Sequence, residues 1–176
     1  MALYNPSYDG LIGIANANSW GKRMTLQTPA EVATSARPQI TAELMERTGL
    51  SDGVLKRLVH GFYDRVRKDP ELGPIFDERI RDWGPHLARM VEFWSSVALM
   101  TGRYHGAPMP KHLTLPVDQS HFDRWLELFR QTATEICTPE GAAWVIERAE
   151  RIAFSIHANV EDARRHYGRA GMPPKL

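Results

Sequence analysis

The sequence predicts an all-α fold, and three observations support that prediction. From Ile40 onward, apolar residues recur at spacings of three and four, which is the period of an amphipathic helix. Glycine, proline and capping residues divide this pattern into segments of helical length. No stretch shows the alternation of apolar and polar residues that is typical of a half-buried strand. We therefore expect helices packed on one another around one core.

The first two expected helices lie between residues 41 and 68. A short helix from 41 to about 48 ends at Gly49, and Ser51 is a suitable N-cap for a longer one. Pro70 ends the longer helix, together with the glycine and proline that follow. Its continuous apolar stripe consists of Val54, Leu55, Leu58, Val59, Phe62, Tyr63 and Val66.

A third helix begins near Asp82 and tolerates Pro85, because the first turn of a helix does not use its amide hydrogens. Gly102 and Gly106 end the helical pattern. Prolines at 108, 110 and 116 exclude a long helix in the next stretch. The apolar residues of the third helix are Trp83, Leu87, Met90, Val91, Trp94 and Val97.

Two more helices complete the pattern. Asp118 or Ser120 caps the fourth helix. The run 138–140 combines a capping threonine, a proline at the first position and an acid in the first turn, which is a good start for a helix to about Tyr167. The apolar residues are Phe122, Trp125, Phe129 and Ala133 in the fourth helix, and Val145, Ala149, Ile152, Ile156 and Val160 in the last.

Residues 1–38 differ from the rest of the chain. They contain five charged residues, many small polar ones and no sustained apolar period. We interpret them as an extension that is loosely ordered or docked on the domain. The helical domain then covers 39–168, and 169–176 form a short tail.

The composition excludes several classes of function. The chain has 176 residues, enough for a conventional core, and its 22 basic and 21 acidic residues leave a net charge of +1. This balance gives no single-sign field to attract nucleic acid. The one cysteine, Cys137, excludes an internal disulfide framework and a thiolate zinc cluster, and it favours the cytoplasm. No apolar run approaches the ~18 residues of a membrane span.

Four polar or amphipathic residues lie where chemistry could occur, and each also has an ordinary structural explanation. Tyr63 and Trp125 lie on apolar stripes, where core packing is the usual role of such residues. His86 shares a helical face with tryptophan, methionine and phenylalanine, as a satisfied interior histidine would. His112 lies between prolines and could be a surface-loop histidine. Taken one at a time, these residues do not decide a function.

Their combination does point to a family. Four segments occur in order: FYDRVRKDPELGPIF (62–76), DWGPHLARMVEFWSSV (82–97), GRYHGAPMPKHLTLP (102–116) and HFDRWLELF (121–129). Together they resemble the truncated globins, and in particular the third, or P-type, group of truncated haemoglobins. The likeness covers about residues 40–167. The chain also has no Gly-Gly pair, which agrees with the third group.

The resemblance implies a helical sandwich around a haem pocket, with haem b (iron protoporphyrin IX) as the cofactor. It implies that His112 is the proximal ligand of the haem iron. The other site residues that it implies are Tyr63, His86 and Trp125 on the distal side, Phe76 against the porphyrin, and Arg89 and Lys111 at the haem propionates.

The resemblance also suggests a function. The implied ligands are O₂, CO, NO or peroxide. A tyrosine hydroxyl and an indole N–H would stabilise bound O₂, which suits redox chemistry with NO or peroxide better than delivery. Enzymatic activity stays open between a nitric oxide dioxygenase-like and a peroxidase-like reaction, with His86 as a proton shuttle or a gate.

Several questions stay open at this point. Redox turnover would need an unidentified reductase, and the sequence does not set the oligomeric state. A haem-based gas sensor and a haem-free helical interaction module are the alternatives to the main interpretation.

Overall fold

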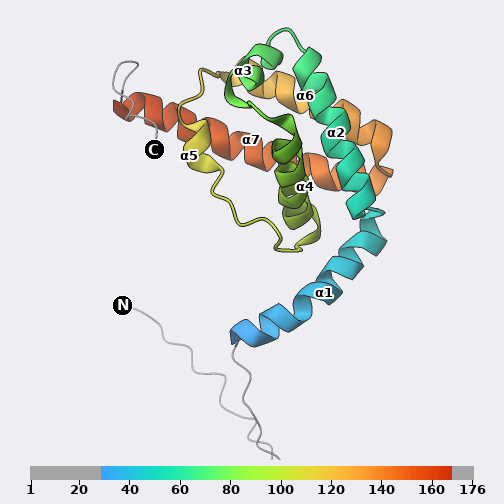
Figure 1. Ribbon diagram of the computed structural model, residues 1–176. Helices are drawn as coiled ribbons and strands as arrows, with labels where there is room; N and C mark the ends of the chain where they lie inside the picture. Colours follow the sequence, from blue (N-terminus) through green and yellow to red (C-terminus); the bar gives the residue numbers. More distant parts are fainter. Residues whose placement is uncertain (1–28, 168–176) are drawn as a thin grey trace, which may run out of the picture.

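The computed structural model describes residues 29–167, with side chains from 37 to 166 (Figure 1). The proposed tail 169–176 and most of the proposed extension lie outside this range. Within it the chain forms helices and no strand, so the predicted all-α class is confirmed. The helices are α1 (Pro29–Thr48), α2 (Asp52–Lys68), α3 (Leu72–Arg79), α4 (Trp83–Leu99), α5 (Met109–His112), α6 (Gln119–Ile136) and α7 (Pro139–Tyr167).

The helices form two crossed layers. In Figure 1, α2 and α4 lie side by side and cross the antiparallel pair of α6 and α7. The short helices α3 and α5 flank this body, with α3 against α2 and α6, and α5 against α7. None of the helices among the described residues is long and apolar enough to cross a bilayer.

Helix α1 is longer than the sequence indicates. It begins at Pro29, runs through Pro38 and projects from the body of the molecule (Figure 1). Residues 37–40 are exposed, so no apolar stripe marks this part of the helix. The packed part begins near Thr41, whose hydroxyl donates to the Leu99 carbonyl at 2.8 Å. The proposed division of the chain at residue 38 therefore falls within one continuous helix.

The predicted capping residues begin their helices as expected. The Ser51 hydroxyl accepts a hydrogen bond from the Val54 amide at 3.3 Å, and the Asp82 carboxylate accepts one from Gly84 at 3.0 Å. The Thr138 hydroxyl accepts from Gly141 at 3.0 Å and donates to the Thr48 carbonyl. Two short helices, α3 and α5, were not predicted, because proline in each hides the helical pattern.

Aromatic rings fill the core between the two layers. Phe62 on α2 is 1% exposed, and its ring lies edge-on to Trp125 and Phe129 of α6, with centroids 5.1 and 5.3 Å away. Trp94 of α4 stacks on Phe129 at 4.7 Å. These contacts join α2, α4 and α6 at one point.

An ion pair between the buried Asp69 carboxylate and the partly exposed Arg124 attaches the corner between α2 and α3 to α6. The Asp69 carboxylate is 2% exposed and accepts hydrogen bonds from the Leu72 and Glu71 amides and from Arg124 Nε, at 2.9, 3.1 and 2.8 Å. Burial alone raises the pKa of Asp69, but the hydrogen bonds from Leu72, Arg124 and Glu71 together hold this pKa below its usual range. The carboxylate is therefore charged at neutral pH.

We predict that Arg124→Met lowers the free energy of unfolding at pH 7 by more than the loss of an ordinary surface ion pair does, because it removes a hydrogen bond to the buried Asp69 carboxylate. The pKa of Asp69 is lower in the folded state than in the unfolded state. The ionised Asp69 therefore contributes its full stabilisation at pH values above its pKa in the unfolded state. This stabilisation is lost as the pH falls through its pKa in the folded state. The difference between variant and wild type should accordingly shrink in acid, as measured by urea denaturation at neutral and low pH.

Arg130→Met is the matched control on the same helix. Arg130 pairs with Glu150 at 2.8 Å, and both side chains are about half exposed, so its loss should cost less than about 1 kcal/mol. Equal losses in the two variants would show that the buried pair has no special role.

Candidate functional site

A cavity of about 380 Å³ lies among α2–α7. Its size is in the range of small-molecule and cofactor sites, and most of its walls are apolar. Every helix from α2 to α7 contributes at least one side chain. Representative apolar lining residues are Leu72, Ile75, Met90, Phe93, Leu115 and Ile152.

His112 lines this cavity from the last residue of α5, a single helical turn between Pro108 and the following loop. Its Nδ1 lies 2.8 Å from the Pro108 carbonyl oxygen. Because a carbonyl only accepts, Nδ1 carries the proton, and Nε2 is left with a free lone pair. This is the arrangement that fixes the ring of a metal-ligating histidine.

Tyr63 and Trp125 line the same cavity from α2 and α6. Tyr63 is 6% exposed, and burial raises the pKa of its phenol, so the hydroxyl keeps its proton and can donate. Trp125 stacks on Phe129 with centroids 5.4 Å apart and planes 9° apart. Two hydrogen-bond donors on different helices thus border one apolar space.

His86 lies beside Tyr63 and does not line the cavity itself. Its ring packs edge-on against Tyr63 at 5.2 Å and Trp83 at 5.7 Å. Among the described residues its Nε2 is buried without a hydrogen-bond partner. Burial lowers the pKa of His86, and the positive charges of Arg89 and Lys111 lower it further. The imidazole is therefore neutral at pH 7 and has one unsatisfied nitrogen, which is costly unless a ligand or water reaches it.

The other three predicted site residues divide between the cavity and the surface. Phe76 lines the cavity, with its ring 6.0 Å from that of Tyr63. Arg89 and Lys111 are exposed and do not line it, although their charges act on His86. The cavity thus brings together Tyr63, Phe76, His112 and Trp125. The remaining three lie beside or outside it.

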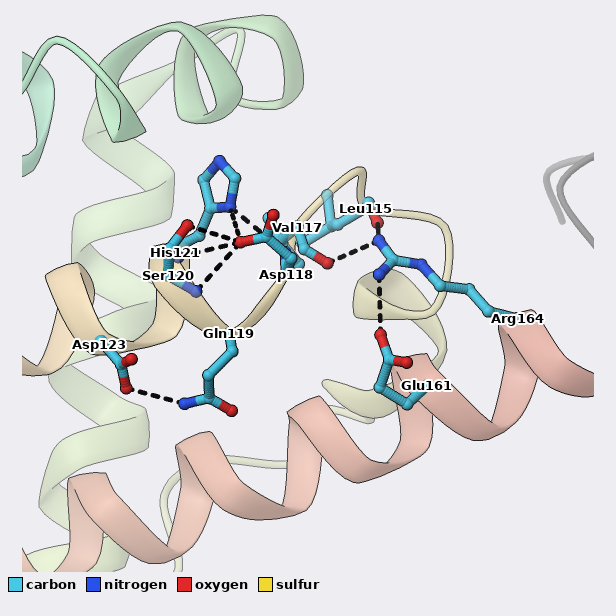
Figure 2. Close-up of polar contacts among 9 residues, drawn as sticks. All are labelled: Leu115, Val117, Asp118, Gln119, Ser120, His121, Asp123, Glu161 and Arg164. Carbon is cyan, nitrogen blue, oxygen red and sulfur yellow. Dashed lines mark hydrogen bonds and ion pairs between the residues drawn. The ribbon is translucent and has the colours of Figure 1, made fainter.

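The sequence analysis missed polar residues in the cavity wall, among them His121. This histidine lies one turn before Trp125 on α6, and the spacing of four could have indicated a shared face. Its Nδ1 lies 2.8 Å from the Asp118 carboxylate and 3.2 Å from the Asp118 amide nitrogen, in the capping box that starts α6 (Figure 2). Arg151 and Ser155 line the cavity from α7, each directly before a predicted apolar position.

The protein comparisons agree with this geometry. Residues 43–158 match the model of the bacterial-like globin family. The chain belongs to this family. It is 38% identical to the group 3 truncated haemoglobin ctb of Campylobacter jejuni over 104 residues, which are 56% of this chain and 82% of the relative. The crystal structure of the group III truncated haemoglobin from Campylobacter jejuni superposes with a TM-score of 0.60, at 34% identity, over 63% of this chain and 91% of the other.

These findings confirm the resemblance to the third group of truncated haemoglobins and identify a haem-binding globin. The residues present fit the cofactor. Most of the cavity wall is apolar, His112 keeps Nε2 free on one side, and within residues 37–166 the buried Nε2 of His86 has no hydrogen-bond partner. Neutral imidazole is the nitrogen ligand that globins use for haem iron.

We predict that the His86 imidazole of this globin titrates below the ordinary histidine value, since both burial and nearby positive charge favour its neutral form. Arg89→Met and Lys111→Met should each raise the pKa of His86, whereas Arg130→Met should leave it unchanged, because Arg130 pairs with Glu150 of α7 and is not among the charges that act on His86. Nuclear magnetic resonance of ring-labelled histidine checks this. A pKa for His86 at or above the ordinary value would contradict the structure.

Proposed function

We propose that this globin binds O₂ at ferrous haem b and serves redox chemistry rather than O₂ delivery, either the reaction of bound O₂ with NO or the activation of peroxide. The observation that carries the proposal is the placement of two donors, Tyr63 and Trp125, on the cavity that His112 also lines. A carrier must release O₂ readily, whereas paired donors in an apolar space slow its release.

The proposed haem site uses seven residues. His112 Nε2 would be the iron ligand, and the Phe76 ring would form part of the apolar wall against the porphyrin. Arg89 and Lys111 are exposed basic residues on the side of His86, suitable for the two propionate carboxylates. When bound, the haem supplies an iron that takes O₂, CO or NO in the ferrous state and reacts with peroxide.

Tyr63 and Trp125 act on the ligand in the cavity. The ring that carries the Tyr63 hydroxyl is held by contacts with the rings of Phe62, Phe76 and Trp83. The Trp125 indole is held in the same way by Phe62 and Phe129. Because these rings are fixed, the donors need little rearrangement to meet partial negative charge on a ligand. An indole N–H only donates, so it favours the ligand without competing for the metal.

His86 is the proposed proton carrier. Its neutral imidazole lies directly behind Tyr63, and Nε2 has no competing partner in the described structure. Because Nε2 is buried and unpaired, it can exchange a proton with a group inside the protein, as peroxide chemistry requires. Nearby Arg89 and Lys111 favour release of that proton.

Turnover needs electrons from a separate reductase, for which the described residues give no identity. We place the protein in the cytoplasm, because a chain with one cysteine has no need of an oxidising compartment.

We predict that Tyr63→Phe and Trp125→Phe each speed O₂ dissociation roughly ten- to hundredfold, since each loses a charge-assisted hydrogen bond of about 1.5–3 kcal/mol. CO dissociation should change far less, because CO carries little negative charge. The double variant should exceed the sum of the single effects if the donors compensate for each other. Stopped-flow measurement of O₂ and CO release gives these rates.

Trp144→Phe is the control, because the Trp144 indole donates to the Ala98 carbonyl at 2.9 Å and does not line the cavity. Its O₂ rate should equal that of the wild type. If all three cavity variants also release O₂ at the wild-type rate, Tyr63 and Trp125 are ordinary core residues and the proposal is wrong.

A further inference from the structure

We propose that Arg164 is a positioning residue for the proximal side of the haem site. It fixes the segment 113–118, which follows His112, against α7 and thereby sets the position of the His112 turn relative to the cavity. This inference rests on the proposed role of His112 as the iron ligand. It assigns a function to a residue that is far from His112 in the sequence and outside the set of residues discussed above.

The segment 113–118 needs partners for its backbone, because it forms neither helix nor strand. Leu115 and Val117 line the cavity. Within the segment, the Leu115 amide donates to the His112 carbonyl at 3.1 Å. The carbonyls of Leu115 and Val117 point toward α7, and this is where Arg164 meets them.

Arg164 reaches both carbonyls with one nitrogen. Its Nη2 donates to the Val117 oxygen at 2.5 Å and to the Leu115 oxygen at 3.3 Å (Figure 2). Hydrogen bonds from a guanidinium are stronger than those between neutral groups. One cation therefore holds two cavity-lining residues through their backbones while their side chains stay free to line the cavity.

The guanidinium is itself held in place. Its Nη1 donates to Glu161 Oε1 at 2.8 Å, one turn earlier on α7, and the Arg164 side chain is 31% exposed. Because the planar fork keeps its donors in fixed directions, the ion pair with Glu161 aims Nη2 at the loop. One hydrogen-bond network therefore connects Glu161, Arg164 and the carbonyls of Leu115 and Val117.

Arg164 differs from the other anchors of this segment because it connects the segment to α7. Pro108 and Asp118 hold its two ends locally, through the His112 ring and the cap of α6. Arg79 of α3 lies 3.5 Å from the Thr114 carbonyl oxygen, which makes this a long and weak hydrogen bond. Ile152 and Ile156 of α7 line the cavity, so a segment fixed to α7 is also fixed relative to that wall.

Loss of Arg164 should leave His112 in its turn but let the turn shift relative to the cavity. Arg164→Met keeps the length of the side chain and removes its donors. Arg165→Met is the matched control, since Arg165 is adjacent, exposed and donates only to the Glu161 carbonyl on its own helix, at 3.4 Å, among the described contacts. Both variants remove one positive charge from the same turn.

The experiment follows haem-loaded protein by two measurements. Transfer of haem to excess apomyoglobin should be roughly tenfold faster in Arg164→Met, the lower bound for a lost hydrogen bond to a charged group, and unchanged in Arg165→Met. The iron–histidine stretching band of the ferrous protein, recorded by resonance Raman, should shift or broaden in Arg164→Met alone. Arg164→Lys keeps a charged donor without the fork and should recover part of both effects.

A second variant keeps the inference testable if Arg164→Met does not fold. Glu161→Gln leaves the guanidinium present but weakens its anchoring, so it should show the same changes to a smaller extent. The inference is overturned if the iron–histidine band and the haem transfer rate of the Arg164 and Glu161 variants match those of Arg165→Met. An iron–histidine band absent from the wild type would instead overturn the proposed function, so the two failures are distinguishable.

Discussion

The distal half of the site depends on the packing of one ring, that of Phe62. Protein interiors are close-packed, so a cavity of this size persists only where its walls support one another. Phe62 lies edge-on to Tyr63, Trp125 and Phe129 at 5.1, 5.1 and 5.3 Å. Both proposed donors touch this ring, so their spacing is set by core packing between α2 and α6.

The proximal half is built in a different way, from backbone hydrogen bonds. The Pro108 carbonyl sets the tautomer and orientation of His112, and Arg164 holds the carbonyls of Leu115 and Val117. Asp118 then starts α6 with a capping box. The two halves meet because the same helix α6 begins at the proximal loop and carries Trp125 less than two turns later. Because both lie on the first two turns of α6, the cap at Asp118 and the indole of Trp125 are held by the same part of one helix.

Local features such as helix caps can be predicted from the sequence, whereas contacts between segments far apart in the chain cannot. The capping residues Ser51, Asp82 and Thr138 act as predicted, and four motifs in order identified the family. The first half of α1 has no apolar stripe, so periodicity could not find it. Arg164 contacts carbonyls 47 and 49 residues away, and no local pattern encodes such a contact. The position of His86 behind Tyr63 likewise depends on how α2 and α4 pack.

We propose that one cavity presents His112 to the haem iron on one side and the donors Tyr63 and Trp125 on the other. The most direct test is the absorption spectrum and iron content of His112→Gly, purified with and without imidazole. We expect the variant to lose most of its haem. It should regain the haem, with the spectrum of a histidine-ligated globin, when imidazole fills the space left by the His112 side chain. Full haem content and an unchanged Soret band without imidazole would contradict the proposal.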